Sequence, residues 1–337
     1  MPAIQRPTYT AHRIADRFGT SPFTREAALS AGISRKQLDS ALAHKLVVRL
    51  RHGTFVMIAE GEDRDFRAVH HVEIAGVLSR VRNAVVSHES AAVMHGLPLP
   101  SRAHADGQLA VAVTIPGTRP IPDQGFRVSG NALSKSDLCL IGDFTVTSVA
   151  RTAIDLARKY RLPDAVFIVD SAARKMISSQ LVDLDGDIDL RDGVHRLDMR
   201  QQALSNLWDA AHSMRGWKGI GYARAALRIA EPACESPLES LSRFNIWESG
   251  LPRPKFGWPV QGASGRIFWA DAYWPDHRVI GEADGAMKYE SRELLYREKR
   301  REDDLRAAGF GFIRWNWEEG VSHPHRMIGK ISRALGL

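Results

Sequence analysis

Cysteine and long apolar runs are what this sequence has least of. It holds two cysteines in 337 residues, Cys139 and Cys234, too few for a disulfide framework or a four-cysteine zinc site. We therefore expect two buried thiols and no zinc. No segment reaches the ~20 apolar residues of a membrane-spanning helix, and the first 20 residues carry no apolar run of the signal-peptide kind. These absences predict a cytoplasmic protein with no membrane partner.

Internal repeats and low-complexity tracts are absent as well, which leaves a globular composition with a basic balance. Hydrophobic residues make up 44% and charged residues 25%, enough for two or three domains with cores of their own. The net charge is +7 and the pI is about 9.6. A basic balance indicates an anionic partner, of which nucleic acid is the commonest for a soluble protein.

Residues 1–60 have the order of elements of a winged helix-turn-helix domain. Thr24 is placed to cap a first helix, and Ser34 with Gln37 forms the capping box of a second. Residues 46–57 alternate apolar and basic side chains around a turn, which predicts a hairpin that serves as the wing. The start of the second helix and the wing give the DNA-binding candidates Ser34, Arg35, Lys36, Gln37, Lys45, Arg49 and Arg51. The alternative is a winged helix that binds another protein.

The middle of the chain predicts an α+β domain over residues 61–180, then a connector and helices over 181–233. Apolar runs of the β type at 109–115 and 144–146 lie between turn-rich stretches, and 149–160 has a helical pattern. Residues 181–198 are polar and rich in Asp and Gly, which predicts an exposed connector.

Residues 234–337 predict a separate α/β domain with the order helix, three strands, helix, strand. The expected elements are a helix at 238–248, strands at 256–260, 267–273 and 278–283, a charged helix at 290–308 and a strand at 310–317. The positive and negative charges of the second helix nearly cancel. For most of them this indicates a solvated helix whose side chains form ion pairs.

Carboxylates gather on these strands. Asp271 lies near the end of one strand, and Glu282 and Asp284 lie two residues apart at the end of the next, so that they share a face. Glu239 sits in the first turn of the preceding helix. Carboxylates brought together repel unless protons or a cation intervene, and oxygen ligands suit Mg²⁺ or Mn²⁺. Any single strand-end carboxylate is more often solvated, but four in this arrangement favour a metal site that polarises a phosphate.

The same residues resemble the very-short-patch-repair-like branch of the PD-(D/E)XK endonucleases. The similar stretches are Ser236-Pro-Leu-Glu239-Ser, Trp269-Ala-Asp271-Ala-Tyr-Trp-Pro275 and Gly281-Glu282-Ala-Asp284-Gly285, followed by Lys288-Tyr289. The resemblance implies a restriction-endonuclease-like fold in which Glu239, Asp271 and Glu282 hold Mg²⁺ or Mn²⁺ beside the scissile phosphate. It implies no organic cofactor.

The sequence departs from that family at the motif lysine, which is replaced by Asp284. Lys288 follows one helical turn later and is the candidate to offset charge at the phosphate. Arg314 is a further candidate for the phosphate side of the site, and its alternative is a structural ion pair with Asp271 or Glu282. The catalytic candidates are therefore Glu239, Asp271, Glu282, Asp284 and Lys288.

The N-terminal part resembles AbiEi-type antitoxins of type IV toxin–antitoxin systems. The similar stretches are Phe23-Thr-Arg-Glu-Ala-Ala-Leu29, Val86-Ser-His88-Glu-Ser90 and Thr147-Ser148-Val-Ala-Arg151-Thr152. The resemblance implies a winged helix that binds its own promoter and a toxin as partner. Two hypotheses follow: a Mg²⁺- or Mn²⁺-dependent DNA endonuclease, and an antitoxin-like repressor whose nuclease fold is inactive. A homodimer fits either one, because two winged helices would read an inverted repeat.

Overall fold

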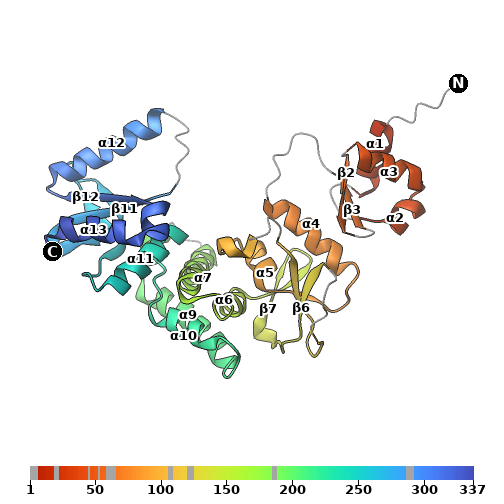
Figure 1. Ribbon diagram of the computed structural model, residues 1–337, viewed down its shortest axis with the longest axis horizontal. Helices are drawn as coiled ribbons and strands as arrows, with labels where there is room; N and C mark the ends of the chain where they lie inside the picture. Colours follow the sequence, from red (N-terminus) through yellow and green to blue (C-terminus); the bar gives the residue numbers. More distant parts are fainter. Residues whose placement is uncertain are drawn as a thin grey trace. The chain divides into compact units, whose positions relative to one another are not determined.

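The computed structural model describes residues 7–18, 23–44, 46–51, 54–57, 66–104, 109–119, 125–183, 188–285 and 292–337. The chain divides into two units, Met1–Ser148 and Val149–Leu337, and both combine helices with sheets (Figure 1). The fold is thus mixed α and β, with one antiparallel and two mixed sheets. Within the described residues, no helix is long and apolar enough to cross a membrane.

The first unit begins with short helices and a three-stranded antiparallel sheet of order β1-β3-β2. The elements are α1 (Pro7–Phe18), β1 (Phe23–Thr24), α2 (Arg25–Ser30), α3 (Arg35–Ala43), β2 (Val47–Arg51) and β3 (Thr54–Met57). Both predicted caps are present: Thr24 accepts the Ala27 amide at 3.0 Å, and Ser34 and Gln37 form a reciprocal capping box. The predicted order of two short helices and a hairpin is confirmed.

The rest of this unit is a mixed five-stranded sheet, of order β6-β5-β4-β8-β7, with helices beside it. The elements are α4 (Phe66–Leu78), β4 (Val85–Val86), α5 (His88–His95), β5 (Val111–Thr114), β6 (Phe126–Ser129), β7 (Leu138–Ile141) and β8 (Phe144–Thr147), with single turns at Ser101–His104 and Lys135–Asp137. Both β-type runs predicted from the sequence form strands here. Their apolar side chains, among them Val111, Val113 and Val146, pack against Ile74 of α4.

The second unit opens with five helices: α6 (Val149–Ala157), α7 (Leu162–Asp183), α8 (Leu190–Gly193), α9 (Leu197–Ser213) and α10 (Ile220–Arg228). The expectation of an exposed connector at 181–198 is wrong in part. Leu181 and Val194 are buried, and α8 lies inside the segment. The polar composition hid this, because few side chains in the described part of the segment are both apolar and buried.

The remainder is a four-stranded sheet of order β12-β11-β10-β9 with helices on both faces. The elements are α11 (Pro237–Ser249), β9 (Lys255–Gln261), β10 (Ile267–Trp274), β11 (Val279–Asp284), α12 (Arg292–Ala307), β12 (Gly311–Asn316) and α13 (Pro324–Leu335), with single turns at Pro275–His277 and Glu318–Ser322. The predicted order of elements is confirmed, and α13 is an addition to it. Helices α11 and α13 lie on one side of the sheet and α12 on the other (Figure 1). Apolar residues of α11 and α13 pack on one face, and Leu305 of α12 packs on the other.

The sheet is antiparallel except for β11 and β12, which run parallel and are joined through α12. A parallel pair needs such a crossover, so α12 lies over the strand that carries Glu282 and Asp284. At the other face, Ser236 caps α11 by accepting the Glu239 amide, and Gly250 ends the helix in a left-handed conformation. Helix α11 thus positions Glu239 on one face of the sheet, and α12 brings Arg301 to Glu282 of β11 on the other.

Candidate functional site

Three carboxylates from three different elements meet at the sheet. Glu239 comes from the first turn of α11, Asp271 from β10 and Glu282 from β11. Burial raises the pKa of Asp271 well above its ordinary value, and the negative charges of Glu239 and Glu282 raise it further. The structure therefore brings together the three residues predicted from the sequence as metal ligands.

A kink in two strands places Asp271. Residues two apart on a strand normally share a face, yet Phe256 and Trp258 of β9 lie in the hydrophobic clusters of opposite faces, as do Ala270 and Ala272 of β10. The switch occurs at Gly257, whose φ of 51° is left-handed and whose Cβ, if present, would lie 2.9 Å from the Ala233 carbonyl oxygen. Asp271 lies between the switched residues of β10.

Beyond this kink, the Asp271 carboxylate takes the place of a backbone hydrogen bond between β10 and β11. The backbone pairs of β10 and β11 end at Ala272 and Gly281, and the Ala283 amide donates to Asp271 Oδ2 at 2.8 Å instead. The carboxylate is held at the point where the two strands separate.

Glu239 is buried and held by the loop before its own helix. Its carboxylate accepts the Glu235 amide at 2.8 Å and the Ser236 hydroxyl at 2.7 Å. Burial outweighs these two hydrogen bonds and raises the pKa of Glu239 from 4.5 to about 7. Near neutral pH this side chain therefore exchanges a proton.

Glu282 is buried against α12, where Arg301 covers it. Arg301 donates to both carboxylate oxygens, at 2.8 and 3.1 Å, and also to the Trp269 carbonyl at 2.7 Å. Burial still raises the pKa of Glu282, although the guanidinium lowers it. The charged helix α12 is thus no simple solvated face, because one of its arginines lies inside the acidic cluster.

The remaining predicted residues of this domain lie further out. Asp284 is exposed by 41% and lies 3.9 Å from the Arg314 guanidinium. Arg314 also pairs with Glu298 and Glu302, both at 2.9 Å. The ion-pair alternative for Arg314 is therefore realised with other partners than Asp271 and Glu282. Its Nε is buried without a hydrogen-bond partner in the described structure.

The DNA-binding candidates other than Arg314 belong to the first unit and are described apart from the acidic cluster. Ser34, Arg35 and Lys36 are exposed at the start of α3, and Gln37 is half-buried. Arg49 and Arg51 lie on β2, but their side chains are outside the described part. Lys45 and Lys288 also lie outside the described residues.

A basic flank of the acidic cluster was not predicted. Arg191 of α8 and Arg174 of α7 each hold Glu235 at 3.0 Å, and the charge of Asp271 acts on Arg191. His195 hydrogen-bonds the Gly257 carbonyl at 2.7 Å and stacks on Trp269. Arg191 and His195 belong to the segment 181–198, which the sequence predicts to be an exposed connector. Basic residues among its acidic ones are the one local feature that indicates a role at the cluster.

The oxygens of Glu239 and Glu282 already accept hydrogen bonds, which bears on whether the cluster can bind a cation. Among the described residues, no three His, Cys, Asp or Glu side chains are arranged to hold a metal ion. Both oxygens of Glu282 face Arg301, and both oxygens of Glu239 accept hydrogen bonds from the loop before α11. A cation bound by these carboxylate oxygens would have to replace the hydrogen-bond donors that now occupy them.

We expect the folded protein to lose stability between pH 4.5 and 7 because of Glu239. A carboxyl whose pKa is higher in the folded state binds its proton more tightly there, so its stabilising effect is complete at low pH and disappears by about pH 7. The expected loss is about 3 kcal/mol in the free energy of unfolding. Urea unfolding in EDTA from pH 4.5 to 8 measures it. The Glu239→Gln variant should lose less stability over the same range, and its remaining slope comes from Asp271 and Glu282, whose pKa values are also raised. Equal slopes for both proteins would contradict this assignment.

Comparison with known proteins gives a relationship along nearly the whole chain. No protein-family profile matches the sequence. Uncharacterized proteins MT2308 and Rv2248, both of Mycobacterium tuberculosis, are each 24% identical to it over 308 residues. Each match covers 90% of this chain and 97% of the other. The similarity is therefore to proteins of nearly the same extent, and both units take part in it.

Proposed function

We propose that this protein binds DNA and hydrolyses its phosphodiester bonds with Mg²⁺ or Mn²⁺. The observation that carries the proposal is the meeting of Glu239, Asp271 and Glu282, with raised pKa values, at one place on the sheet. Buried carboxylates that repel one another weaken a fold unless protons or a cation offset their charge. Their placement is better explained by a bound ligand than by stability. We assign residues 234–337 a restriction-endonuclease-like fold on the same ground.

The donor set fits a hard cation. All three side chains offer oxygen, which suits Mg²⁺ or Mn²⁺ rather than the Cys and His ligands of structural zinc. When bound there, the cation supplies polarisation of a phosphate oxygen and a bound water of lowered pKa. Asp284, half exposed beside the cluster, orients water, and Arg314 contacts the phosphate. Lys288 offsets charge on the phosphate in place of the missing motif lysine.

Cleavage of supercoiled and linear DNA tests the nuclease directly. The wild-type protein is incubated with Mg²⁺ or Mn²⁺, and a parallel sample contains EDTA. We expect nicked and then linear product that EDTA prevents. Retained DNA binding without cleavage under either metal would overturn the enzymatic part of the proposal.

DNA binding is assigned to α3 and the hairpin that follows it, as a winged helix over residues 1–60. Arg35 and Lys36 are exposed at the start of the helix, where a recognition helix meets the backbone and base edges. We expect the double variant Arg35→Ala/Lys36→Ala to lower the slope of log K against log salt by about 2. Fluorescence anisotropy over a salt series measures this, with Arg82→Ala as a control for lost exposed charge. An unchanged slope would place the DNA contact elsewhere.

Arg301 favours a second candidate function, an antitoxin-like repressor with an inactive nuclease fold. A guanidinium with two hydrogen bonds to Glu282 offsets the same charge that a cation would. Asp284 in place of the motif lysine points the same way. Such a protein would bind its own promoter, as a dimer on an inverted repeat, and a toxin partner.

Substitution of Arg301 separates the two functions. If Glu282 is a metal ligand, Arg301→Gln removes a competitor, and Mn²⁺ should bind about tenfold more tightly, a change of about 1.4 kcal/mol. Calorimetric titration measures this, and Arg297→Gln on the exposed side of the same helix is the control. If neither the wild type nor Arg301→Gln binds Mn²⁺, the repressor is the better description.

A further inference from the structure

The turn that joins α9 to α10 is held in place by the end of α6. The Lys218 carbonyl accepts a hydrogen bond from Arg158 of α6 at 3.3 Å. The guanidinium groups of Arg151 and Arg158 each lie over the Trp217 ring, 5.1 Å from its centre. A Cβ on Gly219 would overlap the Arg158 carbonyl oxygen, so the two backbones touch at that point. The backbone of the turn is therefore fixed by its neighbours, while the Lys218 side chain is exposed.

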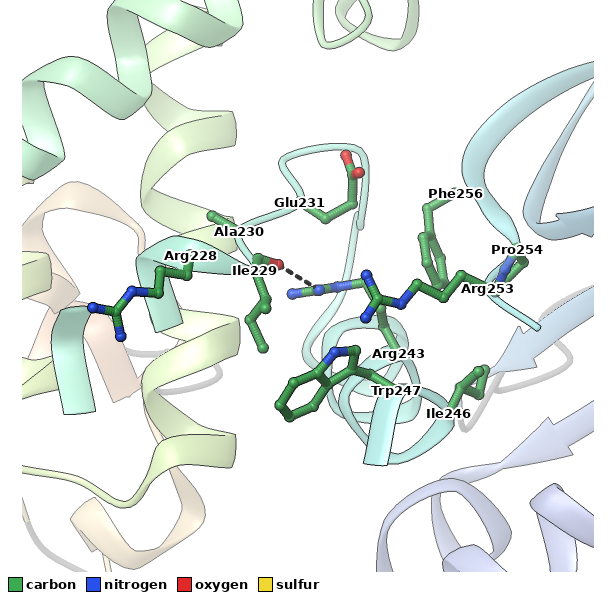
Figure 2. A pocket seen from close by; sticks show the side chains of 10 residues that line it. All are labelled: Arg228, Ile229, Ala230, Glu231, Arg243, Ile246, Trp247, Arg253, Pro254 and Phe256. Atoms are coloured by element: carbon green, nitrogen blue, oxygen red, sulfur yellow. Dashed lines mark hydrogen bonds between the residues drawn. The ribbon is translucent and has the colours of Figure 1, made fainter. Parts of the chain in front are cut away.

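Positive charge collects on this turn and on the helix that follows it. Residues 210–230 contain four basic side chains of Lys and Arg and no acidic one: Arg215, Lys218, Arg224 and Arg228. None of the four has an ion pair with a described residue, and all but Arg224 are exposed. Arg228 borders a cavity of about 220 Å³ at the end of α10 but points away from the other side chains around it (Figure 2). Its charge therefore belongs to the outer surface of the helix.

An exposed glycine lies among these charges on α10. Gly221, Arg224 and Arg228 follow one another at intervals of three and four residues, so they share one face of the helix. A Cβ on Gly221 would meet no atom within 4 Å, so packing inside the protein does not require a glycine there. Glycine weakens a helix relative to alanine. Gly221 thus lowers the stability of α10 but lets a partner approach its backbone closely.

Lys218 is also placed against the local electrostatics. It lies two residues before the first residue of α10, where the helix dipole carries partial positive charge. A cation at this end of a helix is unfavourable unless an anion is bound nearby. Neither Lys218 nor Gly221 is explained by contacts within the protein, and a bound anion explains both.

We propose that the turn and the exposed face of α10 form a second DNA-contacting surface, which binds the phosphate backbone of duplex DNA. This α10 surface consists of Arg215, Lys218, Gly221, Tyr222, Arg224 and Arg228. The inference rests on the proposed DNA binding and adds a contact in the second unit; it does not depend on cleavage.

The extent of the α10 surface favours a polyanion over a small anion. Gly221 and Arg228 are seven residues apart, about 10 Å along the helix axis. A strand of DNA presents one phosphate in about 3.4 Å of its axis, so a duplex can meet several of these charges at once. Tyr222, which is 51% exposed, adds a hydroxyl of the kind that hydrogen-bonds phosphate oxygens. These groups contact backbone and carry no information about base sequence.

Fluorescence anisotropy with a short duplex in EDTA, over a salt series, tests the α10 surface in the full-length protein. We expect Arg215→Ala/Lys218→Ala to lower the slope of log K against log salt by about 2, because two phosphate contacts are lost. Arg253→Ala/Arg333→Ala removes two exposed charges elsewhere in the second unit and should leave the slope unchanged. An unchanged slope in the first variant, or an equal fall in both, would overturn the proposal.

Gly221→Glu tests the same surface through a gain of stability. The added side chain enters open space, and a glutamate near the start of α10 favours the helix, so the melting temperature should stay the same or rise. DNA affinity should nevertheless fall about tenfold, because the carboxylate repels the phosphates. Gly221→Gln fills the same space without charge and should weaken binding less. Wild-type affinity in Gly221→Glu would overturn the proposal.

The two levels of the DNA-binding proposal fail in different ways. If the wild type binds no duplex at any salt concentration, the proposed DNA binding is wrong and the α10 surface is wrong with it. If the wild type binds and Arg35→Ala/Lys36→Ala lowers the slope while Arg215→Ala/Lys218→Ala does not, the α10 surface alone is wrong. Reductions by both variants that add when the two are combined would support two separate contacts.

Discussion

Asp271→Asn is expected to abolish metal-dependent DNA cleavage, with a fall in rate of about 10³-fold or more, equal to roughly 4 kcal/mol. The substitution removes the negative charge at the centre of the cluster. It keeps an oxygen that can accept the Ala283 amide, so the junction of β10 and β11 stays intact. Loss of a ligand charge, not of structure, is then the cause of the effect.

The same variant should be more stable than the wild type in EDTA. Burial and the charges of Glu239 and Glu282 all disfavour an ionised Asp271, and a neutral amide relieves that strain. Activity lost together with stability gained is the signature of a functional charge. Asp276→Asn, at an exposed turn, is the matched control and should change neither property. Cleavage that survives in Asp271→Asn would remove this residue from the mechanism.

Much of the acidic cluster could be predicted from local sequence. Glu282 lies two residues from Ile280, and both are on the face of β11 that meets α12, as the alternation of side chains along a strand requires. The capping sequence at Ser236 correctly predicts the start of α11 and hence the place of Glu239. These features depend on neighbours in the chain, which is why spacing reveals them.

The contacts that define the charge of the cluster could not be predicted. Arg301 and Glu282 are 19 residues apart, and an arginine on a charged helix has the same pattern whether it faces water or a buried carboxylate. The face switch at Gly257 depends on the close approach of the Ala233 carbonyl, which no local pattern contains. Tertiary packing decides both.

Helix α13 differs from these contacts, because the local sequence does contain the pattern that predicts it. Met327, Ile331 and Leu335 recur every four residues and are buried against the sheet, and Gly336 ends the helix in a left-handed conformation. The last element predicted from the sequence is the strand at 310–317, which ends before this pattern begins. The domain therefore has a second helix on the face that α11 covers.

Arg243→Met is expected to lower the free energy of unfolding by about 3–5 kcal/mol. Arg243 reaches from α11 to Asp170 of α7, which is fully buried, and their side chains are 2.7 Å apart. Burial raises the pKa of Asp170, and Arg243 is the main group that opposes this rise. Without the arginine, Asp170 is left as an unpaired buried charge or takes up a proton. Urea or thermal unfolding measures the loss.

The double variant Asp170→Asn/Arg243→Met identifies the cause. Asparagine keeps an oxygen for the Glu231 amide, which donates to Asp170 at 2.7 Å, but carries no charge. If the cost of Arg243→Met comes from the unpaired carboxylate, the second substitution should restore most of the lost stability. If it comes from lost packing of the long side chain, the two losses should add. Recovery would mean that the pair joins α7 to α11 through charge complementarity. Since α11 also carries Glu239, disruption of the pair would then weaken the cluster as well as the fold.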